Sequence, residues 1–203
     1  MAIKNRGYIM SKTMDKIAKS KNTKSQPILR GTHITSNKIE VCDRHVAIIE
    51  TFKAPVDTMT GELVLSPKGL PVAGKYPNLD RLMPLESYAT LTIKGQALMD
   101  ILKIKKGAEK AKLFTDDNET LRIKFDHDSD SFAIGTLTGD FNETHFNPTY
   151  LLLMVEEVKE TQGRMFKDNV FKVAWKHENE PMVMDCENED INVKMLVTPL
   201  RQF

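Results

Sequence analysis

The sequence predicts an α+β protein in which one unit, a helix followed by antiparallel strands, occurs three times. Three observations lead to this prediction. Three segments carry apolar residues at helical spacing, strand-like runs bounded by turn residues follow each of them, and a Pro- and Gly-rich stretch separates the first unit from the second. Internal repeats decide architecture more strongly than single motifs do. We therefore expect all the helices to lie on one face of the sheets.

The first unit begins with a predicted helix whose cap is Ser11. Met10, Met14, Ile17 and Ala18 recur at helical spacing, which indicates one buried face. Strands are predicted over 27–34, 37–43 and 45–52. Residues 54–78 alternate Pro with Gly and are predicted to form a connector with one short hairpin around 60–62.

The second and third units repeat this order. Within 91–107, Ala97, Leu98, Ile101 and Leu102 share a helical face, and strands are predicted over 110–116, 120–126 and 131–141. Within 146–163, Pro148 suits a first helical turn, and the apolar stripe consists of Leu151, Met154, Val155 and Val158. Strands are then predicted over 169–177, 181–187 and 191–200. We place the domain boundary near 86, which gives a shortened domain over 1–86 and a complete domain over 87–203.

Charge is segregated along the chain although the net charge is only +1. Residues 1–24 hold seven Lys and Arg and one acid, and residues 94–112 hold six Lys and two acids. The turns after the strands are acidic. A solvated surface explains such runs without any ligand, but lysines on two repeated helices also suit a sequence-independent grip on phosphates. No aromatic residue interleaves with these lysines, which disfavours base stacking on single strands.

Several other functions are not expected. No apolar run approaches the roughly 20 residues of a membrane span, and the first ten residues lack the apolar core of a signal peptide. Cys42 and Cys186 stand far apart, which is typical of structural thiols in a reduced, cytoplasmic protein. Residues 126–130 alternate acids as a calcium loop does, but Leu137 stands where the bidentate Glu belongs, so we expect no metal. No catalytic motif or cofactor fingerprint is present, and we expect neither an enzyme nor a cofactor.

Four stretches in order carry a family resemblance. They are "VCDRHVAII" at 41–49, "YPNLDRLMP" at 76–84, "FNPTYLLLMVEEV" at 146–158 and the terminal "LVTPLRQF". Together they resemble the bacterial DNA polymerase III β subunit, the sliding clamp. The family has three domains, or six half-repeats, in each chain, whereas three half-repeats are counted here. The resemblance therefore implies a truncated clamp-like protein.

The resemblance also implies a groove for partner peptides between the last two domains. The positions that match the family's groove are His45, Ala47, Pro84, Asn147, Tyr150, Thr198, Pro199, Leu200 and Arg201. Ala47 is smaller than the family's usual Leu, and the tail is one residue longer after its Arg than is usual. Apolar walls with a few polar groups suit short linear motifs with Leu and Phe anchors. Plain packing of the tail on the core is the alternative for residues 200–203.

The leading hypothesis is a DNA sliding-clamp-like processivity factor, a non-enzymatic homo-oligomer that holds duplex DNA and tethers a polymerase or another replication protein. The expected DNA-binding residues are Lys12, Lys16, Lys19, Lys21, Lys103, Lys105 and Lys106. The main alternative is a monomeric interaction module that keeps the groove but does not encircle DNA. A third hypothesis is an α+β DNA-binding regulator unrelated to clamps.

Overall fold

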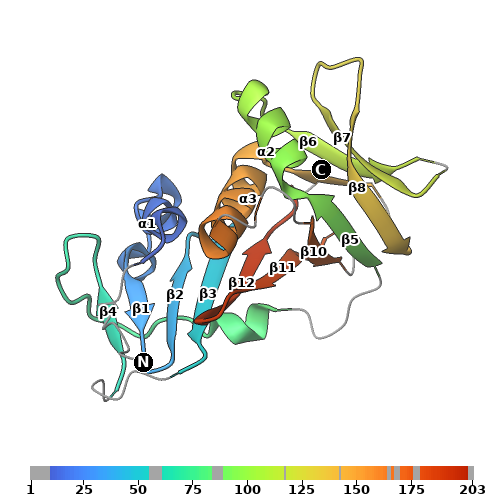
Figure 1. The fold of residues 1–203 in the computed structure, drawn as a ribbon. Helices are drawn as coiled ribbons and strands as arrows, with labels where there is room; N and C mark the ends of the chain where they lie inside the picture. The colour runs from blue at the N-terminus through green and yellow to red at the C-terminus, as the bar shows by residue number, and fades with distance from the viewer. Residues whose placement is uncertain are drawn as a thin grey trace.

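Three α-helices lie on one side of a 12-stranded antiparallel sheet (Figure 1). The structure is a computed structural model and describes residues 10–54, 61–83, 89–116, 118–141, 143–163, 166, 170–175 and 179–200. The α-helices are α1 (Lys12–Ala18), α2 (Gly95–Ile104) and α3 (Pro148–Gln162), and the short 3-10 helices are η1 (Lys21–Thr23), η2 (Pro27–Arg30) and η3 (Leu79–Leu82). The strands are β1 (Thr32–Ile34), β2 (Lys38–Cys42), β3 (Val46–Phe52), β4 (Leu63–Leu65), β5 (Ala89–Lys94), β6 (Ala111–Thr115), β7 (Thr120–Phe125), β8 (Phe132–Gly139), β9 (Thr144–Phe146), β10 (Val170–Trp175), β11 (Met182–Glu187) and β12 (Ile191–Val197).

The threefold repeat is confirmed by the order of the elements. Each α-helix is followed by three strands that pair in sequence: β1–β3 after α1, β6–β8 after α2 and β10–β12 after α3. Across the sheet the strands run in the order β4-β1-β2-β3-β12-β11-β10-β5-β8-β7-β6-β9. The first unit joins the third through β3 and β12, which pair from Phe52 and Ile191 to Val46 and Val197.

Some local predictions were wrong. Residues 27–30 form η2, not a strand, because Pro27 fixes its own φ and has no N–H to donate. The strands β5 and β9, which come just before α2 and α3, were not predicted. The hairpin predicted at 60–62 lies partly outside the described residues; instead β4 pairs with β1, and Leu65 forms a bridge with Pro71. The proposed boundary near 86 also lies outside the described residues, and β5 opens the second unit at Ala89.

Local signals in the sequence explain where α1 and α3 begin. The side chain of Ser11 accepts a hydrogen bond from the Met14 backbone N–H at 3.1 Å, as an N-cap does. Asn147 caps α3 in the same way through the N–H of Thr149 at 2.9 Å, and Pro148 occupies the first turn. The stripe of α3 is fully buried in the main core, where each such side chain stabilises the fold by roughly 1.5–3 kcal/mol.

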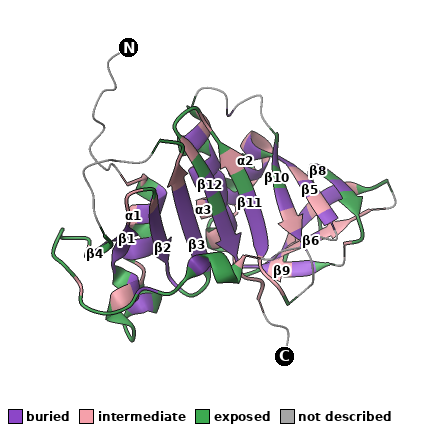
Figure 2. Ribbon diagram, turned by 90° about the horizontal axis from the view of Figure 1, so that it is seen from below, coloured by how far each residue is buried: buried purple, intermediate pink, exposed green. Residues whose placement is uncertain are grey.

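The sheet of the first unit is covered on both faces, as the buried strands β2 and β3 in Figure 2 show. On β3, Val46 and Ile48 belong to the main core beneath the helices, whereas Ala47 and Ile49 point to the other face. There they form a second apolar cluster with Leu79 of η3 and with Tyr76. The connector thus covers the sheet on the side away from the helices.

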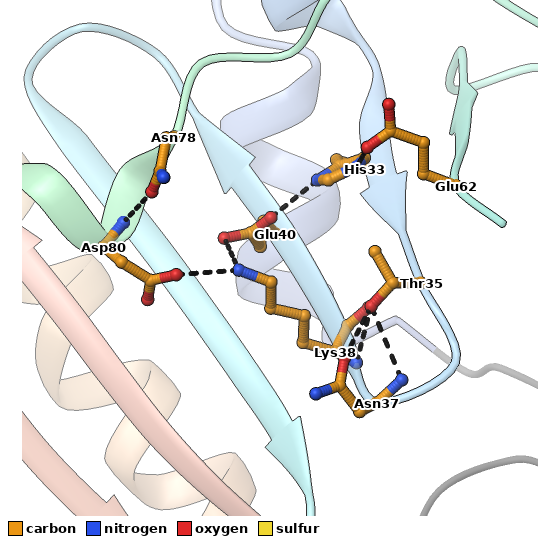
Figure 3. Close-up of polar contacts among 8 residues, drawn as sticks. All are labelled: His33, Thr35, Asn37, Lys38, Glu40, Glu62, Asn78 and Asp80. Atoms are coloured by element: carbon orange, nitrogen blue, oxygen red, sulfur yellow. Dashed lines mark hydrogen bonds and ion pairs between the residues drawn. The ribbon is translucent and has the colours of Figure 1, made fainter.

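A polar network fixes the connector to this outer face (Figure 3). His33 and Glu40 stand opposite each other on β1 and β2, and the His33 Nδ1 lies 2.6 Å from a Glu40 carboxylate oxygen. The Lys38 ammonium donates to Glu40 and to Asp80 of η3, both at 2.9 Å. The ring of Tyr76 stacks on His33 with centroids 5.0 Å apart. The network therefore positions the segment that leads towards the second unit.

Candidate functional site

The positions expected to form a peptide groove gather where β3, β12 and the start of α3 meet. The ladder between β3 and β12 brings residues from both ends of the chain together. The Thr198 N–H donates to the His45 carbonyl at 2.9 Å, and the Leu200 N–H donates to the His145 carbonyl at 2.7 Å. The tail therefore continues past Pro199 from the start of β3 to β9, and Thr198, Pro199 and Leu200 are half-buried.

A tight turn presents His45 at this place. One carboxylate oxygen of Asp43 accepts the backbone N–H groups of His45 and Val46 at 3.1 and 3.0 Å. Arg44, between them, has a positive φ of 82°. The Asp43 side chain is almost completely buried, whereas His45 is exposed. The turn thus holds the imidazole of His45 outside the sheet in a defined position.

Tyr150 of α3 completes the polar part of the site. Its ring stacks on His45 with centroids 5.5 Å apart and planes at 14°. The Asn22 side-chain amide donates to the Tyr150 hydroxyl at 2.9 Å and to Asp43 at 3.1 Å. Burial raises the pKa of Tyr150 and the Asp43 carboxylate raises it further, while the hydrogen bond from Asn22 lowers it. The phenol is therefore held neutral, as a flat ring with a polar end.

Ala47 does not reach the surface of this site. Its side chain is fully buried and lies in the outer apolar cluster with Leu196, its partner in the β3–β12 ladder. Val183 and Leu79 belong to the same cluster, and the half-buried Met83 packs against it. The small Ala47 side chain thus lies in a cluster that the connector covers, next to the polar part of the site.

The structure brings most of the expected groove residues together. His45 and Tyr150 stack on each other, Asn147 caps the same helix, and Thr198–Leu200 runs beside them. Pro84 and Arg201 lie outside the described residues. Sequence reasoning missed Asn22, whose partners are far away along the chain, and Asp43, which stood within the stretch that carried the resemblance.

The seven expected DNA-binding lysines belong to the helix side of the molecule. Lys12, Lys16 and Lys19 line the exposed side of α1 and its end, and Lys21 opens η1. Lys103 is exposed on α2, and Lys105 and Lys106 follow its end. The lysines therefore form two groups, one at α1 and η1 and one at the end of α2.

Three of these lysines already have acidic partners. Lys16 pairs with Glu156 of α3 at 2.6 Å, Lys19 with Asp15 at 2.6 Å, and Lys105 with Asp128 at 2.7 Å. Within the described part of the chain, Lys12, Lys21, Lys103 and Lys106 have no ion pair. These four are the ones that can contact a phosphate without breaking an existing pair.

The acidic turn after β7 serves the protein itself. Asp126 accepts the Lys110 backbone N–H at 3.2 Å, and Asp128 is the partner of Lys105. No group of three or more His, Cys, Asp or Glu side chains in the described ranges is arranged to hold a metal ion. No described helix is long and apolar enough to cross a membrane.

No protein-family model matches the sequence, and no curated protein matches it. Among solved structures, the β chain of DNA polymerase III from Streptococcus pneumoniae aligns with a TM-score of 0.73 at 16% identity, covering 94% of this chain and 63% of that chain. The fold is that of bacterial sliding clamps.

Other sliding clamps agree closely with this match. The β subunit from Streptococcus pyogenes has a TM-score of 0.71 at 18% identity, and the sliding clamp from Bacillus subtilis has 0.70 at 14%. Each covers 94% of this chain, and this chain spans 64% and 62% of theirs. The chain thus has the clamp fold and spans less than two thirds of the length of these clamps, and the hypothesis of an α+β fold unrelated to clamps is wrong.

Proposed function

We propose that this chain is a DNA sliding-clamp-like processivity factor that holds duplex DNA without reading its sequence. The observation that carries the proposal is the clamp fold over 94% of the chain, with the helices on one face and with Lys12 and Lys103 on them, which have no ion pair within the described residues. Lysines on a fixed surface bind phosphates of any sequence. In this proposal, several copies join by head-to-tail contacts and close a ring around the duplex.

The second part of the proposal is a tether for replication proteins. The stacked pair His45–Tyr150, with the tail at 198–200 beside it, combines an aromatic surface with the fixed polar groups of Asn22 and Asp43. Such a surface suits a short peptide with Leu and Phe anchors. A polymerase or another replication protein would supply that peptide.

The alternative function is a monomeric module that binds such peptides and does not encircle DNA. What favours it is that the stacked pair His45–Tyr150 and the tail at 198–200 come together within a single chain. In this case the groove is the whole function, and the helix lysines only keep the protein soluble.

The test compares retention on circular and linear duplex DNA for the wild type and for Lys12→Glu/Lys103→Glu/Lys106→Glu. These three lysines have no ion pair in the described structure, so their replacement breaks no existing pair. We expect the variant to lose most of its association with duplex DNA. A ring would also remain on circular DNA at high salt and slide off linear DNA, whereas simple phosphate contacts fail with salt on both.

The matched control is Lys68→Glu/Lys75→Glu/Lys172→Glu, which changes the same charge at exposed positions on the connector and on β10. This control should keep most of the wild-type affinity for duplex DNA, because it removes the same net charge from positions away from the helices. Equal losses in both triple variants would show that binding follows total charge and not the helix surface, and the proposed DNA function would then be wrong.

A further inference from the structure

A cavity between the strands of the second unit and β9 lies outside both parts of the proposed site. It has a volume of about 250 Å³ and lies over the ends of β6, β7 and β9. Its lining includes three lysines and two histidines: Lys110, Lys112, Lys124, His127 and His145. A hollow of this composition suits a negatively charged group.

The strand register explains how the basic side chains meet. Lys112 stands directly opposite Lys124 on one side and opposite His145 on the other. Their neighbours Ala111, Leu113, Ile123 and Phe146 are buried in the core beneath the helices. Since side chains alternate along a strand, Lys112, Lys124 and His145 point to the opposite, outer face. Like charges directly opposite each other destabilise a sheet unless an anion stands near them.

Asp126 and Asp128 also line the cavity, and these two acids and the nearby Glu143 are already engaged by other groups. Glu143 forms an ion pair with Lys112, Asp126 accepts the Lys110 backbone N–H, and Asp128 pairs with Lys105. Within the described residues, the ammonium groups of Lys110 and Lys124 have no ion pair. Burial lowers the pKa of His145; Glu143 raises it, whereas Lys112 and Lys110 lower it, as positive neighbours do. Two lysines thus remain available for an incoming anion.

One residue, His145, takes part in both the cavity and the contact that holds the tail. The side chain of His145 lines the cavity, and its backbone carbonyl holds the tail through the Leu200 N–H. Asn147, which caps α3 and leads to Tyr150, follows only two residues after His145. A peptide in the groove would therefore reach the cavity with the residues that flank its anchors.

We propose that this cavity binds acidic side chains that flank the anchors of the partner peptide, with Lys110 and Lys124 as the cationic contacts. The inference rests on the proposed tethering function and adds a preference for Glu or Asp on one flank. DNA is the less suitable occupant, because Lys112, Lys124 and His145 point away from the core that lies beneath the helices. The contacts are exposed ion pairs, so each adds modest affinity.

The experiment measures binding of three labelled peptides by fluorescence anisotropy. All carry the same Leu and Phe anchors; one has glutamates before the anchors, one has glutamates after them, and one has glutamines on both sides. We expect one acidic peptide to bind the wild type about three- to tenfold more tightly than the neutral peptide, and high salt to abolish the difference. Lys110→Gln/Lys124→Gln should lose this preference and keep its affinity for the neutral peptide.

The control variant Lys94→Gln/Lys172→Gln removes the same charge elsewhere and should keep the preference. Equal binding of all three peptides by the wild type would overturn the inference and leave the tether intact. If no peptide binds, the tether itself is wrong and the inference falls with it. A loss of duplex DNA affinity in Lys110→Gln/Lys124→Gln as large as in the helix variant would also overturn it, because the cavity would then belong to the DNA surface.

Discussion

Tyr150 is the residue on which the proposed tether depends most. Its ring provides the flat surface beside the tail, and its hydroxyl is held by Asn22. We expect Tyr150→Ala to weaken binding of the neutral Leu/Phe peptide by about tenfold or more, as loss of an aromatic anchor does. Tyr150→Phe keeps the stacking on His45 and loses only one hydrogen bond, so its effect should stay below about tenfold. Unchanged affinity in a well-folded Tyr150→Ala would remove Tyr150 from the site.

A second residue-scale feature is a pair of buried carboxyl groups. Glu50 of β3 and Glu157 of α3 are both almost fully buried, and Ser11 donates to Glu157 at 2.8 Å. Burial raises the pKa of Glu50 to about 7 and of Glu157 to about 8. Glu160 of α3 adds further negative charge near both, and the thiol of Cys186 on β11 has its own pKa raised by burial. The pair therefore keeps protons that an exposed Glu loses near pH 4.5.

The direction of the resulting pH dependence follows from these pKa values. Below pH 4.5 both carboxyl groups are protonated in the folded and in the unfolded protein. Their contribution to the free energy of unfolding is therefore at its maximum there. As the pH rises to about 8, the unfolded chain gives up protons that the folded chain retains, and stability falls. We expect Glu157→Gln to flatten this fall and to be more stable than the wild type at pH 8 by on the order of 2 kcal/mol. Urea unfolding at several pH values tests this, with Glu189→Gln, an exposed acid, as a control that should behave as the wild type does.

The sequence predicted features whose signals are local. Pro148 indicated the first turn of α3, and Ser11 indicated the cap of α1. It could not show that Lys16 meets Glu156, because the two lie 140 positions apart. The hydrogen bond from Asn22 to Tyr150 spans 128 positions and has no local signature either.

At the scale of elements, periodicity identified the long segments and failed at short ones. All three α-helices were predicted because their apolar stripes repeat over at least two turns. β9 has only three residues, too few for a visible alternation. β5 continues into α2 at Gly95 without a turn between them, so its residues were read as part of the helical segment.

The pairing of β5 with β8 makes a stability prediction for Gly135. A Cβ at this position would lie 1.9 Å from the Thr92 carbonyl oxygen, which belongs to the backbone and cannot move aside cheaply. We expect Gly135→Ala to lower the free energy of unfolding by about 2–3 kcal/mol or more. Thr136→Ala, at the exposed neighbouring position, should cost less than about 1 kcal/mol. Similar midpoints for both variants in thermal unfolding would show that the two strands lie farther apart than described.

At the scale of the whole molecule, the repeat correctly predicted the architecture, because three similar units imply similar packing of helix on sheet. How many copies assemble was not predictable, since an interface between chains leaves no periodicity in one sequence. If the protein forms a ring, sedimentation at several concentrations should give a native mass that is one discrete multiple of 23.1 kDa. A stable monomer at high concentration would exclude a ring and support the monomeric module.

The ladder between β3 and β12 has a consequence for how the protein is made. β3 ends at Phe52, but its partner begins at Ile191, so a ribosome synthesises well over a hundred residues between them. Until β12 has emerged, β3 presents an open row of hydrogen-bonding groups on an apolar strand, which is a template for pairing with other chains. Nascent chains that stop before β12 should therefore depend on chaperones or aggregate, even though the first helix and its strands are already complete.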